Sequence, residues 1–267
     1  MLNSGTKIFK NFDGLKVMIR VIKALVMREL ITRYGRKNVG FLWTFFEPAF
    51  FAFLVTLVWT FVRMHERSTF PITAFIYIGY SNGLLWRNTI NQCFHAINAN
   101  QGLLYHSIVK PIDLVISRWL LEFLSVTGGA IALGLLFGGF GYVPFPHDLS
   151  YLLLGWILMA WFGLSMGLIF SALSVLSEVV EHFIQAFLYI FWILSGSLFA
   201  AEFLPPNVRK YFLYLPTLHI AEMVRYGLLG PIINYYYDII YPVFFNLIAL
   251  AVGFFLLKIA ERKIEVE

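Results

Sequence analysis

Six apolar segments, each close to the length that crosses a lipid bilayer, run through the chain. They cover about residues 42–62, 72–91, 114–137, 149–176, 183–199 and 239–259. A transmembrane α-helix needs about 20 predominantly apolar residues. Only 13% of the 267 residues are charged, about half of the share found in soluble domains. The sequence therefore predicts an all-α integral membrane protein with six transmembrane helices, in a single domain over residues 1–267.

Positive charge is concentrated before the first of these segments. Up to Lys37 there are nine Lys or Arg residues and two acidic residues, a net charge of +7; the whole chain has +5, so the remaining 230 residues sum to −2. Segments rich in Lys and Arg stay on the cytoplasmic side of a membrane. We therefore expect a cytoplasmic amino terminus, and six spans then return the tail over residues 260–267 to the cytoplasm.

The segment from Leu15 to Leu30 has helical periodicity. Its apolar residues recur every three or four positions, while Lys16, Arg20 and Lys23 lie on another face. This pattern is typical of an amphipathic helix in the headgroup plane, although a buried helix of a soluble domain would show it too. We expect a mobile tail over residues 1–13, the interfacial helix up to residue 38, and the six-span bundle over residues 39–259.

Two connections between the spans are too long to be simple turns. Residues 92–113 are polar and should lie in the cytoplasm, whereas residues 200–238 should lie outside. In the second connection, Thr217 could cap a helix that reaches Leu229, and Gly230 would end it. Backbone groups in lipid must be hydrogen-bonded internally, so we expect short re-entrant or gate helices between spans five and six.

The sequence contains no recognisable motif for catalysis. A phosphate-binding P-loop requires Gly, four residues and then Gly-Lys-Ser/Thr, but the pair Gly35 and Gly40 is followed by Phe41. The six His residues are scattered, and the single Cys93 excludes a disulfide within the chain. We therefore expect a chain that is not an enzyme and that binds no metal and no cofactor itself.

Charged residues within or near the spans are few, and four of them form two pairs of opposite charge. Arg118 and Glu122 are four residues apart, and Glu222 and Arg225 are three apart, so each pair can close along one helix face. Local neutralisation is the structural interpretation, and a direct role in transport is the alternative. Arg87 is surrounded in sequence by amide side chains, so its helix should emerge into cytoplasmic water there.

Small residues predict where helices pack closely. Gly163, Gly167 and Ser171 recur at four-residue spacing in the fourth segment, and Gly134 and Gly138 do so in the third. Such spacing lets two helix backbones approach each other. We interpret it as packing.

Aromatic residues recur at three- or four-residue spacing in the first and fifth segments. Aromatic faces stack on the C–H faces of sugar rings, so a wall of rings could guide a glycan without gripping it. Packing against lipid or other helices is the alternative. The candidates for a substrate path are Trp43, Phe46, Phe50, Phe187, Tyr189 and Trp192.

Two stretches carry a resemblance to a known family. Arg33-Tyr34, Val39-Gly40-Phe41-Leu42-Trp43 and Glu47-Pro48 resemble the first-span signature of ABC-2 type permeases that export polysaccharides. Residues 215–227, Leu-Pro-Thr-Leu-His-Ile-Ala-Glu-Met-Val-Arg-Tyr-Gly, look like that family's segment before its last span. The resemblance covers essentially the whole chain, which is most similar to the inner-membrane permeases of Gram-negative capsular polysaccharide export systems.

The resemblance implies a homodimer in the bacterial inner membrane, bound to two copies of a separate ABC ATPase that holds ATP and Mg²⁺. It implies export of a lipid-anchored acidic polysaccharide along the dimer axis to periplasmic and outer-membrane export proteins. Residues 96–105 would be the coupling segment that contacts the ATPase, and residues 203–229 the outer gate. The coupling candidates are Arg28, Glu29, Ala96, Asn98, Asn100, Gln101 and Tyr105, and the gate candidates are Tyr211, Tyr214, Glu222 and Arg225.

Other functions stay open at this point. The exported compound could be an O-antigen, a teichoic acid or a small hydrophobic molecule. An integral-membrane glycan or lipid transferase would need a catalytic acid or base that faces the interface. His65, Glu66, His147 and Asp148 are available for that role, but they form no motif.

Overall fold

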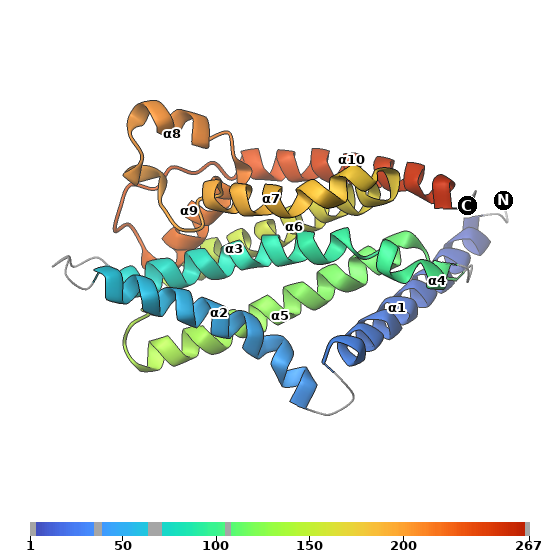
Figure 1. Ribbon diagram of the computed structural model, residues 1–267, viewed down its shortest axis with the longest axis horizontal. Coiled ribbons are helices and arrows are strands. Elements are labelled where there is room, and N and C mark those ends of the chain that lie inside the picture. Colours follow the sequence, from blue (N-terminus) through green and yellow to red (C-terminus); the bar gives the residue numbers. More distant parts are fainter. Residues whose placement is uncertain (1–3, 35–38, 64–70, 105–107, 265–267) are drawn as a thin grey trace.

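The computed structural model describes residues 4–34, 39–63, 71–104 and 108–264, and all regular elements within these ranges are helices. The prediction of an all-α protein is confirmed. The helices at the six expected spans are α2 (Val39–Arg63), α3 (Ile72–Phe94), α5 (Pro111–Gly139), α6 (Leu149–Leu176), α7 (Glu178–Leu194) and α10 (Ile240–Ile264). They run roughly along one axis, and both termini lie at the same end (Figure 1). We call this end the terminus-bearing end.

Among the residues that the structure describes, three of these helices are long and apolar enough to cross a membrane by themselves. They are α5, α6 and α10. Shorter apolar stretches occur within α2, over Ala49–Val58, and within α7, over Val179–Leu194. The chain is thus an α-helical membrane protein by length and composition, while the count of six spans stays a prediction.

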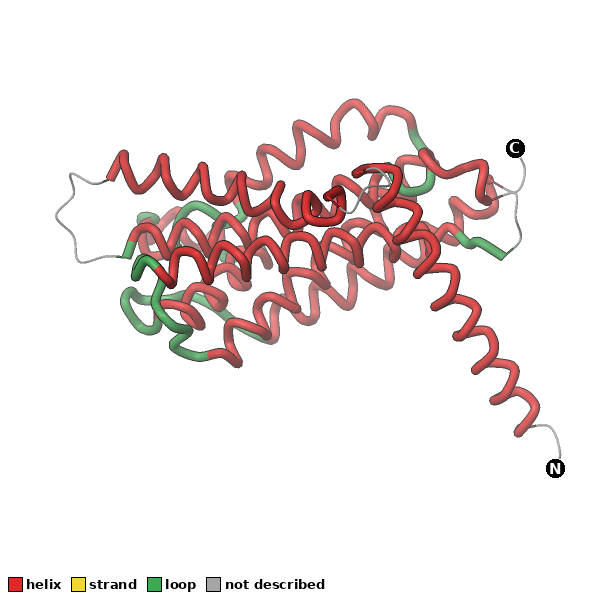
Figure 2. The backbone as a smooth tube through the Cα atoms, turned by 90° about the horizontal axis from the view of Figure 1, so that it is seen from below, coloured by secondary structure: helices red, strands yellow, loops and turns green. Residues whose placement is uncertain are grey.

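Helix α1 covers Ser4–Tyr34, so the expected mobile tail over residues 1–13 is wrong from residue 4 onward. The sequence has no Pro in this range, and its two Gly residues, Gly5 and Gly14, each cost only about 1 kcal/mol relative to Ala. Leu25 is buried, whereas Lys16 and Arg20 are exposed, as the amphipathic pattern predicts. Figure 2 shows α1 leaving the bundle at an angle.

Helix α6 is the centre of the bundle and packs most extensively against α10, α3 and α9 (Pro216–Leu229). The predicted small-residue contacts are confirmed here. A Cβ at Gly163 would lie 3.1 Å from Thr89, and a Cβ at Gly167 would lie 2.9 Å from the Cβ of Cys93. Only hydrogen atoms at these two positions allow α3 to approach α6 so closely. Cys93 is fully buried here as a small apolar side chain.

Helix α7 begins earlier and ends earlier than the expected segment 183–199. It ends at Leu194, because Gly196 has a positive φ of 80° that turns the chain. The carbonyl oxygens of Ser197 and Phe199 leave the helical pattern and accept hydrogen bonds from Arg225, at 2.8 and 2.7 Å. A partner distant in sequence therefore stabilises the non-helical backbone.

The connection between α7 and α10 contains short helices, as predicted. They are the 3-10 turn η2 (Ala201–Phe203), α8 (Pro206–Phe212) and α9. The expected cap is wrong: α9 begins at Pro216 after Leu215, and Thr217 makes no capping hydrogen bond. Proline suits the first turn because its missing N–H would have no helical partner there. The predicted end at Leu229 is confirmed, with Gly230 at a φ of 70°.

The terminus-bearing end contains the connection between α3 and α5. It holds η1 (Asn98–Asn100) and α4 (Gln101–Leu104), and then α5 begins at Pro111. The side chain of Asp113 accepts a hydrogen bond from the Lys110 N–H at 3.0 Å, which stabilises this helix start. Helix α10 continues to Ile264, so most of the expected carboxy-terminal tail is helical.

Candidate functional site

A polar and aromatic surface lies along the contact between α3 and α7. We call it the α3–α7 face, defined by Arg87 and Asn91 of α3 and by Gln185, Tyr189 and Trp192 of α7. The guanidinium carbon of Arg87 lies 4.3 Å from the ring centroid of Tyr189 and 5.4 Å from that of Trp192. The amide of Gln185 donates to Asn91 Oδ1 at 2.6 Å. Gln185 and Tyr189 are exposed, and the other three side chains are half-buried.

This face lies within the length of α3. Arg87 precedes the last residue, Phe94, by seven positions, which corresponds to about 10 Å at a rise of about 1.5 Å per residue. Helix α3 therefore continues beyond Arg87, and the emergence of the chain into cytoplasmic water near this residue stays a prediction. A charged side chain that faces hydrocarbon costs several kcal/mol. The α3–α7 face must therefore meet water or polypeptide when the protein is in a bilayer.

Helix α7 is attached to the rest of the protomer by a narrow stripe. Ile184 and Leu188 are buried, while Phe183, Ile190 and Ile193 are each about 60% exposed or more. Phe187 stacks on Phe191 with ring centroids 5.6 Å apart and is 42% exposed. Most of the α7 surface is thus available to lipid or to another chain.

The two sets of predicted path residues lie on different parts of the protomer. Phe46 and Phe50 line an apolar groove of about 380 Å³ between α2 and α5, together with Phe53. Phe187 and Tyr189 lie on α7, which packs against α3 and α6. Trp43 lies in α2, but its side chain is outside the described residues. In the view of Figure 1, α7 is above α3, and α2 and α5 are below it.

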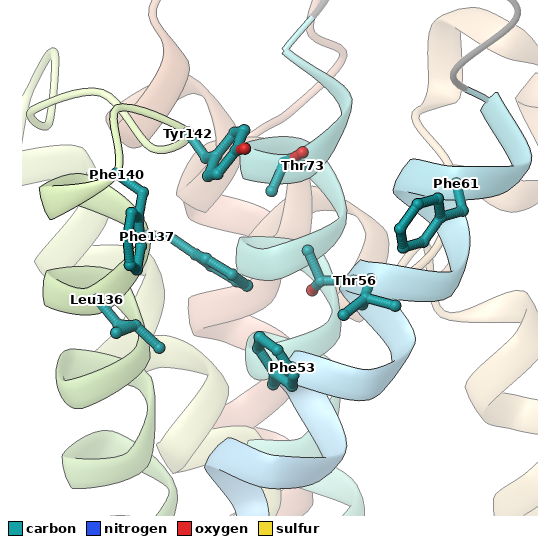
Figure 3. A pocket seen from close by; sticks show the side chains of 9 residues that line it. Phe53, Thr56, Phe61, Thr73, Leu136, Phe137, Phe140 and Tyr142 are labelled. Atoms are coloured by element: carbon teal, nitrogen blue, oxygen red, sulfur yellow. The ribbon is translucent and has the colours of Figure 1, made fainter.

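A second apolar groove continues along α2 and α5 toward the end opposite the termini. Its volume is about 340 Å³ (Figure 3). Rings from both helices line it, with Phe53 on α2 and Phe137 on α5 stacked at a centroid distance of 5.9 Å. Phe53 lines both grooves, which makes them one continuous apolar surface. Its chemistry suits hydrocarbon chains.

The coupling candidates gather at the terminus-bearing end. Arg28 Nη1 donates to Asn100 Oδ1 at 2.8 Å, and Glu29 forms an ion pair with Arg118 at 3.2 Å. The predicted partner of Arg118 was Glu122 on its own helix, whereas the ion pair that the structure shows is with Glu29 of α1. Of the remaining candidates, Ala96 is fully buried, Asn98 and Gln101 are exposed, and Tyr105 lies outside the described residues.

His95 lies beside this cluster, immediately after α3. Burial lowers the pKa of His95, and the positive charge of Arg118 lowers it further, whereas Glu181 raises it. A lowered pKa keeps the imidazole neutral at pH 7. The charge at this end is therefore carried by arginine, lysine and carboxylate groups.

The gate candidates divide into buried and exposed residues. Glu222 and Arg225 form the predicted ion pair, at 3.6 Å, and both side chains are completely buried. The carboxylate of Glu222 also accepts from the N–H groups of Ala201 and Tyr236, each at 3.2 Å. The pair thus holds the connection between α7 and α10 together. Tyr211 and Tyr214 are exposed, at 65% and 73%, at the end opposite the termini.

Sequence analysis missed two of the residues that shape the site. Gln185 had no signal beyond being an amide within an apolar helix. Arg209 lies in an exposed helix, where its N–H groups donate to the carbonyls of Ala201, Glu202 and Leu204 at 2.9 to 3.1 Å. Neither role can be inferred from helical spacing, because each depends on a contact with another element.

Two of the residues considered for a transferase have structural roles. Asp148 Oδ1 accepts from the N–H groups of Ser150 and Tyr151 and caps α6. The ring of His147 packs edge to face against Tyr226 at 5.9 Å. The other two, His65 and Glu66, lie outside the described residues. The described pair therefore stabilises the fold.

Comparison with known proteins shows what the chain is similar to. The family model of ABC-2 type transporters matches residues 20–229. The capsule polysaccharide export inner-membrane protein CtrC of Neisseria meningitidis serogroup B is 36% identical over 242 residues, 91% of each chain. BexB of Haemophilus influenzae, which carries the same description, is 37% identical over 256 residues, 95% of this chain and 96% of the relative. The polysialic acid transport protein KpsM of Escherichia coli is 28% identical over 254 residues, 94% and 97% of the two chains.

Proposed function

This chain belongs to the ABC-2 type transporter family, and on that premise we propose that it is the inner-membrane permease subunit of a capsular polysaccharide exporter. A separate ATPase subunit drives it, and the cargo is a polysaccharide on a lipid anchor. Two permease copies enclose the path, and both termini are cytoplasmic. The near full-length similarity to capsule polysaccharide export proteins supports this assignment.

The observation that carries the proposal is the α3–α7 face. Arg87, Asn91 and Gln185 place a cation and two amides within the length of membrane helices, beside the rings of Tyr189 and Trp192. Lipid tails cannot solvate such groups. A water-filled path that carries sugars can solvate them, because amides form hydrogen bonds with hydroxyl groups and aromatic rings stack on the faces of sugar rings.

A second copy of the chain would complete the path. In one protomer, the rings of α2 and those of α7 lie on opposite sides of α3, so one protomer does not enclose a channel with them. Helix α7 leaves most of its surface uncovered, including Ile190 and Ile193. A homodimer that apposes these surfaces encloses the α3–α7 faces of both copies and removes them from lipid.

The ATPase contacts the permease at the terminus-bearing end and transmits its conformational change there. Asn98 and Gln101 are exposed there and available to a partner. Arg28 and Asn100 connect α1 to the coupling segment, and Glu29 connects α1 to α5 through Arg118. Displacement of the coupling segment by the ATPase is then transmitted to α1 and α5 together. This linkage opens and closes the path during the ATP cycle.

The test is the fate of the polysaccharide in cells that lack this chain. We expect the polymer to accumulate in the cytoplasm, with none at the surface, and expression of the wild-type chain should restore export. The tagged chain should copurify with an ABC ATPase and with a second, differently tagged copy of itself. Normal surface capsule in the deletion strain would refute the function, and a monomer without an ATPase would refute the architecture.

A further inference from the structure

Two arginines buried in the bundle are neutralised by protein groups. Arg118 pairs with Glu29 at 3.2 Å and donates to the carbonyl of Gln92 at 3.0 Å. Arg225 pairs with Glu222 and donates to two carbonyl groups. Such partners are the usual condition for an arginine within a membrane protein. In this fold, carboxylate and carbonyl groups of the chain itself thus neutralise and hydrogen-bond a buried guanidinium.

Arg87 has no partner of this kind. Within the part of the chain that the structure describes, it forms neither an ion pair nor a hydrogen bond. Its contacts are the rings of Tyr189 and Trp192, at 4.3 and 5.4 Å. A cation over aromatic rings gains a modest electrostatic attraction, but the rings accept none of its N–H donors.

The stacking positions Arg87 for an anion. Trp192 is itself held by Tyr80, with ring centroids 5.4 Å apart in an edge-to-face arrangement. Aromatic rings leave the N–H donors of a guanidinium available, and these donors match a carboxylate or a phosphate with two parallel hydrogen bonds. Arg87 is half-buried, so these donors can be reached from outside the protomer.

We propose that the α3–α7 face contains an anion-binding subsite, in which Arg87 binds a carboxylate or phosphate group carried by the exported glycan. The subsite rests on the proposed export function. Tyr189 and Trp192 position the guanidinium, and the hydrogen-bonded amides of Asn91 and Gln185 lie beside it for sugar hydroxyls. A single arginine gives a weak contact, which lets successive acidic residues of a polymer bind and leave in turn.

Binding of acidic and neutral oligosaccharides tests the subsite. The full-length permease in phosphatidylcholine nanodiscs is titrated with three fluorescent oligomers of similar length: oligosialic acid, which carries carboxylates, a glycerol-phosphate oligomer, and neutral dextran. We expect Arg87→Gln to weaken binding of an acidic oligomer about tenfold or more, because a charge-assisted bidentate contact is lost. Binding of dextran should stay unchanged. Arg87→Lys, which keeps the charge without the planar fork, should weaken binding less.

Lys258→Gln is the matched control. Lys258 is an exposed cation on α10, six residues before the end of that helix. Its removal changes the net charge equally and should leave acidic binding within about twofold of wild type, because screening weakens distant charges. Unfolding temperatures of all variants are measured in the same nanodiscs, and a normal value for Arg87→Gln shows that the bundle is intact.

Several results would overturn the subsite. One is that the wild type binds neither acidic oligomer, and another is that Arg87→Gln binds them as tightly as the wild type does. A third is that Arg87→Gln loses as much affinity for dextran as for the acidic oligomers, or that Lys258→Gln loses as much acidic binding as Arg87→Gln. If phosphatidylglycerol stabilises the wild type but not Arg87→Gln, while oligosaccharide binding is unchanged, the partner is a lipid phosphate and the proposal is wrong. Retained capsule export in the deletion strain would refute the export function itself. If export is blocked in the deletion strain but Arg87→Gln binds the acidic oligomers normally, only the subsite is refuted.

Discussion

Arg28 of α1 donates a hydrogen bond from Nη1 to Oδ1 of Asn100, 2.8 Å away, across 72 residues of sequence. Asn100 is buried and donates in turn to the carbonyl of Ala96 at 2.9 Å. The amino-terminal helix and the segment between α3 and α5 are therefore one connected unit. Any partner that moves the exposed Asn98 also acts on α1.

Loss of this hydrogen bond should loosen α1. In Arg28→Ala, the hydrogen bond from a charged donor to the buried Asn100 is lost, which is worth about 1.5–3 kcal/mol. We expect faster amide hydrogen exchange over residues 18–32 and over the coupling segment, measured in nanodiscs by mass spectrometry. Lys23→Ala, which removes an exposed cation from the same helix, is the control and should exchange as wild type. Identical exchange in both variants would mean that the hydrogen bond does not hold α1.

The Glu222–Arg225 pair should act on stability. Glu222→Gln removes the negative charge beside a completely buried guanidinium, and an uncompensated buried charge costs about 3–5 kcal/mol. We expect a clearly lower unfolding temperature in detergent and less protein in the membrane. Glu202→Gln is the control, because Glu202 makes hydrogen bonds to Asn234 at the surface and its loss should cost about 1 kcal/mol or less. A stable Glu222→Gln variant that no longer exports would instead support a direct role in gating.

Gly79 should not tolerate a side chain. A Cβ there would collide with the carbonyl oxygen of Ser197 and with the guanidinium of Arg225. Gly79→Ala should therefore displace Arg225 from the backbone that follows α7 and destabilise the protein by about 2 kcal/mol or more. Gly139→Ala, at the end of α5, has no atom within 4 Å of the added Cβ and should be neutral. Thermal unfolding of the two variants in parallel checks this, and equal stabilities would contradict the packing between α3 and Ser197.

Tyr189 should matter for export more than for assembly. Tyr189→Ala removes a ring that is 54% exposed and that contacts Arg87. We expect surface capsule to appear several-fold more slowly after induction, at a normal amount of permease in the membrane. Phe255→Ala is the matched control, since Phe255 is a ring that is 65% exposed on α10, outside the α3–α7 face. If Tyr189→Ala exports capsule as fast as the wild type does, Tyr189 does not line the substrate path.

Local features of the chain were predicted from sequence with useful accuracy. The positions of α2, α3, α5, α6 and α10 follow from runs of apolar residues, and Gly230 marks the end of α9 through its own backbone preference. The Glu222–Arg225 pair could be predicted because residues three apart share a helix face. The family resemblance was likewise carried by short stretches of sequence.

Contacts between distant segments were decided by the tertiary structure. Arg118 pairs with Glu29, 89 residues earlier, and α7 ends at Leu194 where Arg225 binds the following backbone. The position of Arg87 on the rings of α7, without a carboxylate partner among the residues that the structure describes, depends on which helices become neighbours. Helical periodicity specifies which side chains share a face, and hydrophobicity specifies which faces leave water. Neither specifies which two faces meet, because that choice follows from packing over the whole bundle.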